Sequence, residues 1–301
     1  MVKKINIPEP EAGLKFIDVH CHLPFFRPKN DQLPTDKDQL LDYFNMGGLF
    51  LITSTIDMQT LNLTLGFIEK VEENLGFTCG WAPQTVTYTP SNIYHDEWKK
   101  WIDFVQNNRE KFLAIGEIGL DFHHGKTLEK RNKQVEVFRE ILELTENFEK
   151  PYVLHVRNAA ENEFDRQHPK HRFNKKDGAT KEILNILKEF KIKPNKVMWH
   201  CFSGPEEYGR ILPNQGFLLS VPSSAYGFDR WRKATKISPL ESLVTETDSY
   251  YQHPYKKGPF NVPSNVRYSI AAIAYSHNID QKFVSEKTVA NAVKFFNLEI
   301  K

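Results

Sequence analysis

The sequence is poor in cysteine and has no long apolar run. Its three cysteines are Cys21, Cys79 and Cys201, and each lies in or beside an apolar segment far from the other two. This spacing is unlike a disulfide framework and indicates reduced thiols in a reducing compartment. No segment approaches the roughly 18 apolar residues of a membrane span, and Met1–Lys15 has lysines but no apolar stretch of the signal-peptide kind. We therefore expect a cytoplasmic protein without a membrane partner.

The sequence also has almost no net charge. Its 40 Lys and Arg residues and 38 Asp and Glu residues leave a formal net charge of +2. Any attraction to nucleic acid must therefore come from local groups of cations, because the field of the whole protein is weak. A glycine-rich phosphate turn after an early strand is missing as well, which argues against a doubly wound nucleotide-binding sheet.

The chain of 301 residues does contain a regular alternation of strand and helix patterns. Short runs rich in β-branched and aromatic residues are typical of buried parallel strands, and they occur at Phe16–His20, Gly48–Thr53, Gly76–Ala82, Phe112–Ile118, Tyr152–Val156, Lys196–Phe202, Gly216–Val221 and Ser242–Thr247. Between them, apolar residues recur with the spacing of one helix face, as at Val135, Phe138 and Leu142 and at Ile183, Ile186 and Leu187. Eight strands alternating with helices predict an α/β fold, the (β/α)8 TIM barrel. With no repeat or linker in view, we expect a single domain over residues 1–301.

One polar connection is longer than the others. It covers residues 161–178, after the fifth apolar run, and its basic side chains are Arg166, His168, Lys170, His171, Arg172, Lys175 and Lys176. The loops that follow barrel strands lie at the end where active sites form. We interpret the segment as a basic surface insertion beside that end.

Residues of metal-binding type lie at the ends of several apolar runs. His20 and His22 are two residues apart, so both point to the same face of a strand, here into the barrel. The other candidates at strand ends are Glu117, His155, His200 and Asp248. Each alone is more often a core histidine or a helix cap, but a barrel gathers its strand ends around one mouth. We therefore predict that these side chains meet in one cavity.

Five motifs together resemble the TatD family of metal-dependent DNases, within the amidohydrolase-like barrels. In chain order they are FIDVHCHL at residues 16–23, AIGEIGLD at 114–121, VLHVR at 153–157, HCFSG at 200–204 and TETD at 245–248. The combination of HCFSG and GEIGLD is the most specific part, and the similarity extends over nearly the whole chain. The resemblance implies a metal-dependent hydrolase, in particular a deoxyribonuclease with 3′-5′ exonuclease or repair-type action on phosphodiester bonds.

The resemblance also implies two divalent metal ions. One would be held by His20, His22, Glu117 and Asp248, and the other by Glu117, His155 and His200, with Glu117 bridging them. Imidazole and carboxylate ligands suit Zn, Mn or Co better than Ca, and Mg is compatible with the oxygen ligands, so the metal identity stays open. Two metals activate water and stabilise both the attacking and the leaving oxygen. Asp248 is expected to take the proton from that water, which makes Asp248 and Glu117 the expected catalytic residues.

Cations and aromatic residues near the strand ends are candidates for holding the substrate. Arg157 follows His155 on the same side of the strand and can either grip a phosphate or form a salt bridge with Glu117 or Asp121. The insertion and the segments Tyr226–Lys233 and Tyr250–Lys257 interleave basic and aromatic residues, a combination that suits single-stranded nucleic acid. The expected substrate contacts are Arg157, Trp231, Lys170 and Arg172.

Two further side chains have expected roles near the cluster. Glu246 is expected to hydrogen-bond a ligand histidine, because it lies nearer the body of the strand than Asp248. Ser203 lacks the Gly-x-Ser-x-Gly surroundings of a nucleophile, so we do not expect it to act as one.

Three departures from the family pattern leave the substrate open. Tyr250 stands where the family usually has proline, Asn158 stands where it usually has aspartate, and the segment between His155 and His200 is longer than usual. A deacylase that cleaves an amide or ester bond with the same metals is therefore the alternative, because carbonyl and phosphoryl oxygens need similar polarisation. A non-catalytic binding protein is disfavoured by the intact ligand set. We expect a monomer that acts on single-stranded DNA.

Overall fold

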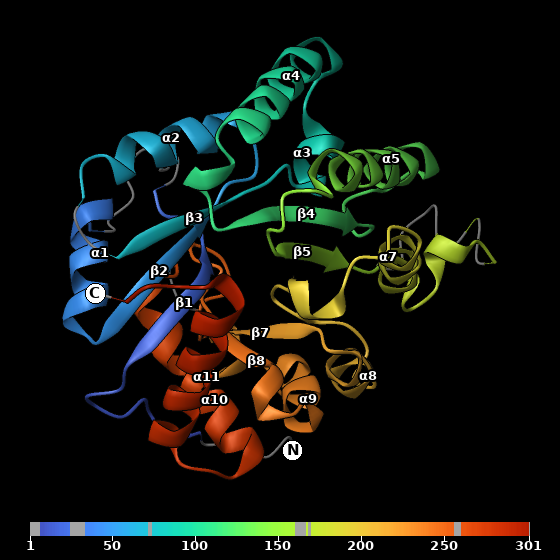
Figure 1. Cartoon of the computed structure of the whole chain (residues 1–301). Helices are drawn as coiled ribbons and strands as arrows, with labels where there is room; N and C mark the ends of the chain where they lie inside the picture. Colours follow the sequence, from blue (N-terminus) through green and yellow to red (C-terminus); the bar gives the residue numbers. More distant parts are fainter. Residues whose placement is uncertain are drawn as a thin grey trace.

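Eight parallel strands form the centre of the computed structural model, which describes residues 7–24, 34–71, 74–159, 167, 170–255 and 260–300. The strands are β1 (Phe16–Cys21), β2 (Gly48–Ser54), β3 (Leu75–Cys79), β4 (Ala114–Asp121), β5 (Tyr152–Arg157), β6 (Val197–Trp199), β7 (Leu218–Pro222) and β8 (Leu243–Glu246). They pair in chain order, each parallel to the next, and the arrows of β4 and β5 point the same way in Figure 1. The predicted (β/α)8 barrel is confirmed.

Helices surround this barrel (Figure 1). In the described part of the chain they are α1 (Asp36–Asn45), α2 (Met58–Ile68), α3 (Pro83–Tyr88), α4 (Ser91–Asn107), α5 (Leu128–Thr145), α7 (Gly178–Glu189), α8 (Tyr208–Gln215), α9 (Asp229–Ile237), α10 (Arg267–His277) and α11 (Gln281–Phe296). Short 3-10 helices are η1 (Arg109–Lys111), η2 (Arg172–Asn174), η3 (Pro194–Lys196), η4 (Ser223–Ala225), η5 (Leu240–Ser242) and η6 (Pro263–Val266). The expected apolar helix faces are confirmed, since Phe138 and Leu142 of α5 and Ile183 and Ile186 of α7 are buried.

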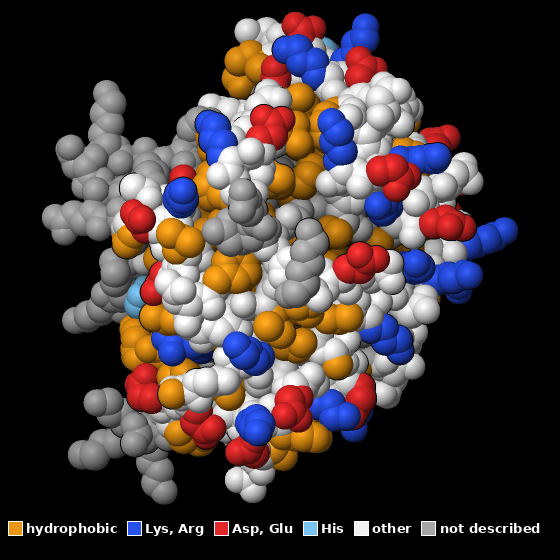
Figure 2. Space-filling view, turned by 60° about the vertical axis from the view of Figure 1, so that its left-hand side comes forward, with side chains coloured by type: hydrophobic (Ala, Val, Ile, Leu, Met, Phe, Trp, Pro, Cys, Tyr) orange, Lys and Arg blue, Asp and Glu red, His pale blue; other side chains and the backbone are white. Residues whose placement is uncertain are grey.

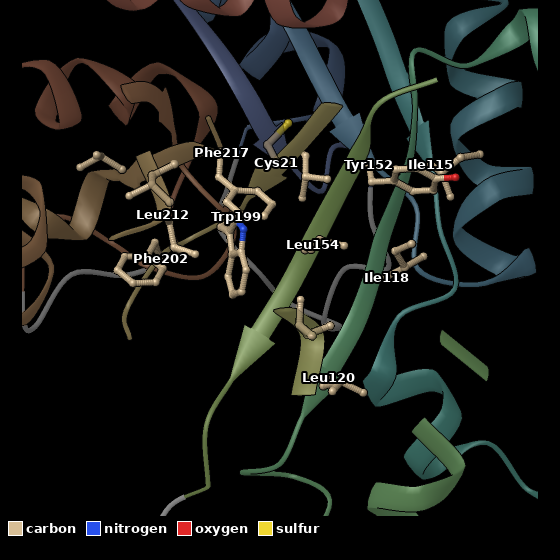
Figure 3. Packing of buried hydrophobic residues seen from close by; sticks show 14 of the residues in the cluster. Cys21, Ile115, Ile118, Leu120, Tyr152, Leu154, Trp199, Phe202, Leu212 and Phe217 are labelled. Atoms are coloured by element: carbon tan, nitrogen blue, oxygen red, sulfur yellow. The ribbon is translucent and has the colours of Figure 1, made fainter. Parts of the chain in front are cut away.

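Buried apolar side chains lie on both faces of the strands. On β5, Leu154 belongs to a large cluster that packs against the helices, together with Tyr152, as Figure 3 shows. Val153, between them, belongs to a second cluster that includes Phe296 of α11. Successive side chains of a strand point to opposite faces, so Val153 and His155 share the face opposite to that of Tyr152 and Leu154. This alternation directs the His155 imidazole into the barrel.

Asp18 joins the first and last strands where the barrel closes. It is 0% exposed and accepts hydrogen bonds from the backbone N–H and the hydroxyl of Thr247, at 3.0 and 2.5 Å. Burial raises the pKa of this carboxyl well above its usual range, in spite of these donors. Beside it, the backbone N–H of Asp248 donates to the carbonyl of His20 at 2.9 Å. The closure of the barrel therefore fixes the distance between His20 and Asp248, two of the predicted metal ligands.

Some strands are shorter than the apolar runs that predict them. β6 ends at Trp199, although its run continues to Phe202. The chain turns there because Cys201 adopts a left-handed backbone conformation, with φ of 45°. β8 likewise ends at Glu246. His200 and Asp248 therefore lie just beyond the strand ends, where their side chains can reach the mouth of the barrel.

The basic insertion is described only in part. Arg166 and His168 lie outside the described residues, as do Lys256 and Lys257 of the loop after β8. The cations whose positions are given are exposed, namely Lys170, Arg172, Lys175 and Lys176. On the face drawn in Figure 2, basic and acidic side chains are interspersed, without a broad area of one sign. This pattern agrees with the weak field expected from the net charge.

Two expectations drawn from what the sequence lacks can be compared with the fold. Cys21, Cys79 and Cys201 are all free thiols, as the absence of a disulfide framework indicated. Among the described helices, none combines the length and the apolar character that a membrane crossing requires.

Candidate metal centre

The two histidines of β1 supply one side of the candidate site. His22 places Nδ1 3.1 Å from the carbonyl of Ser54, which leaves Nε2 turned toward the cluster. His20 is 0% exposed, and neither of its ring nitrogens has a hydrogen-bond partner in the part of the chain that the structure describes. An unpartnered buried imidazole is costly in an apolar interior. A metal ion on Nε2 would remove that cost, so the state of His20 is an observation in favour of a metal.

Glu117 of β4 lies at the centre of the cluster. Its backbone passes so close to β3 that a Cβ on Gly80 would come within 2.1 Å of the Glu117 nitrogen. Gly116 and Gly119 flank it with φ of 157° and 134°, and a Cβ on either would meet β5 at 2.6 or 2.3 Å. The glycines of the GEIG motif are therefore required for the close packing that brings a carboxylate into the barrel interior.

The Glu117 carboxylate faces four imidazoles. Its Oε1 lies 2.5 Å from Nδ1 of His155 and 3.4 Å from Nε2 of His200, and its Oε2 lies 3.5 Å from His20 and 3.8 Å from His22. Burial alone would raise the pKa of Glu117, but positive charge on His200 and His155 outweighs it and holds the pKa well below its usual range. The carboxylate is therefore ionised, as a metal ligand must be.

His155 and His200 form the second side of the cluster. Nδ1 of His155 lies 3.2 Å from Nε2 of His200. The ring of His200 stacks on that of His20 with centroids 3.9 Å apart. Burial lowers the pKa of His155, but the charges of Glu117 and Asp121 dominate and raise it to about 9. Several imidazoles crowded together around one carboxylate are an arrangement that a divalent cation would stabilise.

Asp248 completes the cluster from the end of β8. Its Oδ1 lies 3.4 Å from Nε2 of His22 and 3.9 Å from Nε2 of His20. Asp248 has φ of 52°, a backbone conformation that residues other than glycine rarely adopt and that occurs at functional sites. Burial raises the pKa of Asp248, but the hydrogen bond from His22 and the charge of His200 lower it overall. This carboxylate is therefore also ionised.

Two groups of ligand atoms in the described residues are compact enough to hold a metal ion. One comprises His20, Glu117 and His200, and the other His20, His22 and Asp248, with ligand atoms within 4.8 Å of one another in each. His155 joins the first group through its contacts with Glu117 and His200. The residues predicted from separate strand ends therefore do converge, and their mixed nitrogen and oxygen donors fit a divalent transition metal.

Comparisons with known proteins agree with this arrangement. A family model described as TatD related DNase matches residues 17–297. The chain belongs to the TatD family. It is 28% identical over 283 residues to an uncharacterized metal-dependent hydrolase of Methanocaldococcus jannaschii, with 94% of this chain and 97% of that protein covered. It is 27% identical over 298 residues to the human deoxyribonuclease TATDN3, with 95% and 96% covered.

The fold is shared with solved TatD structures as well. The TatD homolog YJJV of Escherichia coli superposes with a TM-score of 0.70 at 21% identity, over 94% of this chain and 98% of that one. Such low identity supports the fold alone. With the family established by the family model over residues 17–297, the protein is a metal-dependent hydrolase of the TatD family.

Carboxylates lie behind two of the candidate ligand histidines. Glu246 has Oε2 3.5 Å from Nδ1 of His200 and accepts a hydrogen bond from the Ser220 hydroxyl at 2.6 Å. The contact with His200 is an ion-pair distance and not the expected hydrogen bond, since Nδ1 has no hydrogen-bond partner among the described residues. Asp121 has Oδ2 3.1 Å from Nε2 of His155. Asp121, the last residue of the GEIGLD motif, was expected only as an alternative salt-bridge partner of Arg157.

The residues expected to contact the substrate differ in how far they are exposed. Trp231 is 3% exposed and packs into the core, with the Arg230 guanidinium 3.7 Å from its ring. The expectation that Trp231 stacks on a base is therefore wrong, because its faces are covered by the protein. Among the described residues Arg157 is exposed and makes no ion pair, so the alternative of a salt bridge with Glu117 or Asp121 is absent.

Two other side chains bear on substrate binding. Arg172 is largely exposed but pairs with Glu182 at 3.1 Å, whereas Lys170 is exposed at the start of the described part of the insertion. Tyr251, expected only as one residue of the loop after the last strand, is 67% exposed with its ring centroid 6.1 Å from that of His22. The ring of Tyr251 is thus an exposed aromatic ring next to the cluster, whereas the ring of Trp231 is buried.

Proposed function

We propose that this TatD hydrolase is a deoxyribonuclease that cleaves phosphodiester bonds in DNA at the cluster of imidazoles and carboxylates. The observation that carries the proposal is the convergence of ligand atoms on Glu117, with distances of 2.5 to 3.8 Å to four histidines. The deoxyribonuclease name of the human relative, matched over nearly its whole length, supports DNA as the substrate class.

The residues of the cluster fit two divalent metal ions. In this proposal His20, His22, Glu117 and Asp248 hold one of them, and the remaining histidines hold the other together with Glu117. The donor set of imidazoles and carboxylates favours Zn, Mn or Co, and Mg is compatible with it where oxygen donors dominate. When bound, such metals polarise a phosphoryl oxygen and lower the pKa of water.

The protein's own groups then have separate roles. Asp248 is the general base, because its ionised carboxylate lies at the edge of the cluster and can accept a proton from the attacking water on Oδ1 or Oδ2. Glu117 is buried between the two histidine pairs, and it keeps their rings at fixed separations. The Ser54 carbonyl fixes the tautomer of His22, which leaves Nε2 free as a ligand atom.

The substrate is proposed to approach across the rim of the mouth. Arg157 is an exposed cation two residues beyond His155, which suits a contact with the phosphate next to the scissile bond. Lys170 and Arg172 of the insertion are further candidates for phosphates along the strand. Tyr251 offers an exposed ring beside His22 on which an unpaired base can stack. This combination favours single-stranded DNA, in agreement with the spacing of cations and rings in the sequence.

The proposal is tested by reconstitution of the purified full chain. The protein is stripped with a chelator and loaded in turn with Mg, Mn, Co or Zn. It is then assayed on end-labelled single-stranded and double-stranded DNA, with a D-aminoacyl ester in parallel. We expect metal-dependent cleavage of DNA, more rapid on the single strand, and no significant hydrolysis of the ester.

A matched pair of variants assigns any activity to the cluster. Asp248→Asn should abolish cleavage, whereas Glu189→Gln, at a carboxylate that is exposed and paired with Arg139 on the surface, should leave it unchanged. Turnover of the ester by the metal-loaded enzyme, with intact DNA under the same conditions, would overturn the nuclease proposal in favour of the deacylase. Cleavage of DNA at a near-parental rate by metal-loaded Asp248→Asn would refute Asp248 as the base.

A further inference from the structure

Asp121 occupies a buried position next to the candidate metal centre. It is the last residue of β4 and is 0% exposed. Its Oδ1 accepts the backbone N–H of His124 at 2.9 Å. Its Oδ2 receives three side-chain contacts, from His124 Nδ1 at 2.7 Å, Gln84 Nε2 at 3.1 Å and His155 Nε2 at 3.1 Å. Both oxygens of this carboxylate thus face nitrogen atoms.

The backbone of Asp121 is held as firmly as its side chain. Its N–H donates to Oε1 of Gln134 at 2.8 Å, and its carbonyl accepts from Nε2 of the same amide at 3.1 Å. Gln134 is itself buried in α5. A side-chain amide that satisfies both backbone groups of Asp121 fixes the end of β4 to the helix that follows it. The carboxylate therefore has a defined position from which it can orient a neighbour.

His155 has a carboxylate at each of its two ring nitrogens. Nδ1 faces Glu117 at 2.5 Å and His200 at 3.2 Å, and Nε2 faces Asp121. Ionised carboxylates only accept hydrogen bonds, so in the metal-free protein both ring nitrogens carry hydrogen. A metal held by Glu117, His155 and His200 would displace the hydrogen on Nδ1, whereas Nε2 would keep its hydrogen and donate it to Asp121. Once Nε2 carries the hydrogen of a neutral ring, the lone pair lies on Nδ1, the nitrogen that points into the cluster.

The position of Gln84 explains why Asp121 is needed to keep hydrogen on Nε2 of His155. Its amide nitrogen lies 3.2 Å from His155 Nε2 as well as 3.1 Å from the Asp121 carboxylate. Without the carboxylate, the Gln84 amide could donate to Nε2 and favour hydrogen on Nδ1, where a metal could no longer bind. On β1 this arrangement is missing: His22 meets a backbone carbonyl, and among the described residues His20 has no hydrogen-bond partner on either nitrogen. His200 has carboxylates near both ring nitrogens, Glu117 at 3.4 Å and Glu246 at 3.5 Å, but no side-chain amide beside them comparable to Gln84 in the described part of the chain.

We propose that Asp121 is a positioning residue that fixes the tautomer and the ring orientation of His155, so that Nδ1 is the metal-binding nitrogen. The inference rests on the metal centre of the proposed function but not on its substrate. It predicts that Asp121 acts on the metal site shared by His155, His200 and Glu117, and leaves the site near His22 and Asp248 intact. Groups behind ligand histidines typically change metal affinity by about 10- to 100-fold when they are replaced.

The first test measures metal binding to Asp121→Asn. The chelator-stripped full chain is titrated with Mn2+ or Co2+ in a calorimeter. The substitution removes the negative charge that favours hydrogen on His155 Nε2. With its NH2 group at the Oδ2 position the amide also loses the hydrogen bond from His155, and with its NH2 group at the Oδ1 position it meets the backbone N–H of His124. We expect one equivalent to bind about 10- to 100-fold more weakly than in the parent and the other to keep its affinity.

A matched control separates this effect from a general loss of stability. Asp177→Asn makes the same substitution at a carboxylate that accepts from the Tyr208 hydroxyl at 2.9 Å and pairs with Lys181 at 3.0 Å, away from the cluster. It should bind both equivalents as the parent does. Parental affinity for both equivalents in folded Asp121→Asn would overturn the proposal, and so would an equal loss of both.

A second measurement does not depend on the variant folding. In the Zn-loaded parent labelled with 15N at histidine, the resonance of His155, assigned from its loss in His155→Gln, should show hydrogen on Nε2 and none on Nδ1. Hydrogen on Nδ1 with metal on Nε2 would refute the role of Asp121. Neither measurement uses DNA cleavage, so an absence of nuclease activity would refute the proposed function without deciding the role of Asp121.

Discussion

Replacement of the proposed base is the most direct test of the chemistry. In Asp248→Asn the backbone should be unaffected, because the N–H of residue 248 still donates to the His20 carbonyl and its own carbonyl still accepts from Tyr251, at 2.9 and 2.8 Å. His20 and His22 remain as nitrogen ligands. The substitution therefore removes a negative charge and a base while the fold and most of the metal site persist.

The expected size of the effect follows from the role of the carboxylate. A positioned general base contributes about 100- to 10,000-fold to a rate, and an amide has no basic oxygen of comparable strength. A loss of about 100-fold in kcat corresponds to about 2.7 kcal/mol of transition-state stabilisation. Since Asp248 is also a proposed ligand, we expect at least this loss, with one metal equivalent retained.

The assay is single-turnover cleavage of labelled single-stranded DNA, with metal content measured on the same sample. Asp248 has a pKa below its usual range in the metal-free protein because of His22 and His200, so the carboxylate is ionised throughout the neutral range. The parent should therefore show no loss of rate from protonation of this group near pH 7. Activity within threefold of the parent in a metal-loaded Asp248→Asn sample would refute the assignment of the base.

Three further predictions concern pH, charge and aromatic stacking. The pKa of His155 is raised from 6.5 to about 9, so the protonated ring stabilises the metal-free protein below pH 6.5, and this contribution is lost as the pH rises to 9. The melting temperature measured in chelator should therefore fall over that pH window. It should fall less steeply in His155→Gln. Neutralising the insertion cations should lower the salt slope of single-stranded DNA binding by about 0.7 per lost phosphate contact, which a titration of affinity against salt measures; the cations are Arg166, Lys170, Arg172, Lys175 and Lys176. Tyr251→Ala should weaken single-stranded DNA binding by about 1–3 kcal/mol with little change in salt slope. Trp231→Ala should instead cost about 3–5 kcal/mol of folding stability in a denaturant titration, because its ring is buried. Loss of DNA affinity in Trp231→Ala with parental affinity in Tyr251→Ala would restore Trp231 as the stacking residue.

The sequence alone determined the fold and the identity of the candidate ligands. Strand periodicity and the alternation of strands with helices are local properties, so the eight apolar runs could be recognised without knowledge of their neighbours. His20 and His22 share a face because side chains alternate along a strand, and the barrel topology brings distant strand ends together. The predicted cluster follows from these two rules, and the motif resemblance named the family.

Only the tertiary structure decided which side chains stand behind the ligands and which are open to a substrate. Trp231 lies in a segment of alternating cations and aromatic residues, but the packing of α9 against the barrel buries its ring, and burial depends on contacts between distant parts of the chain. Asp121 appears in the sequence as the end of a strand. Its position against His155 arises because β4 pairs with β5 in a register that sets Gly119 opposite His155, and because α3 brings Gln84 to the same carboxylate. No local pattern encodes that three-way contact, since it depends on the relative positions of elements that are far apart in sequence.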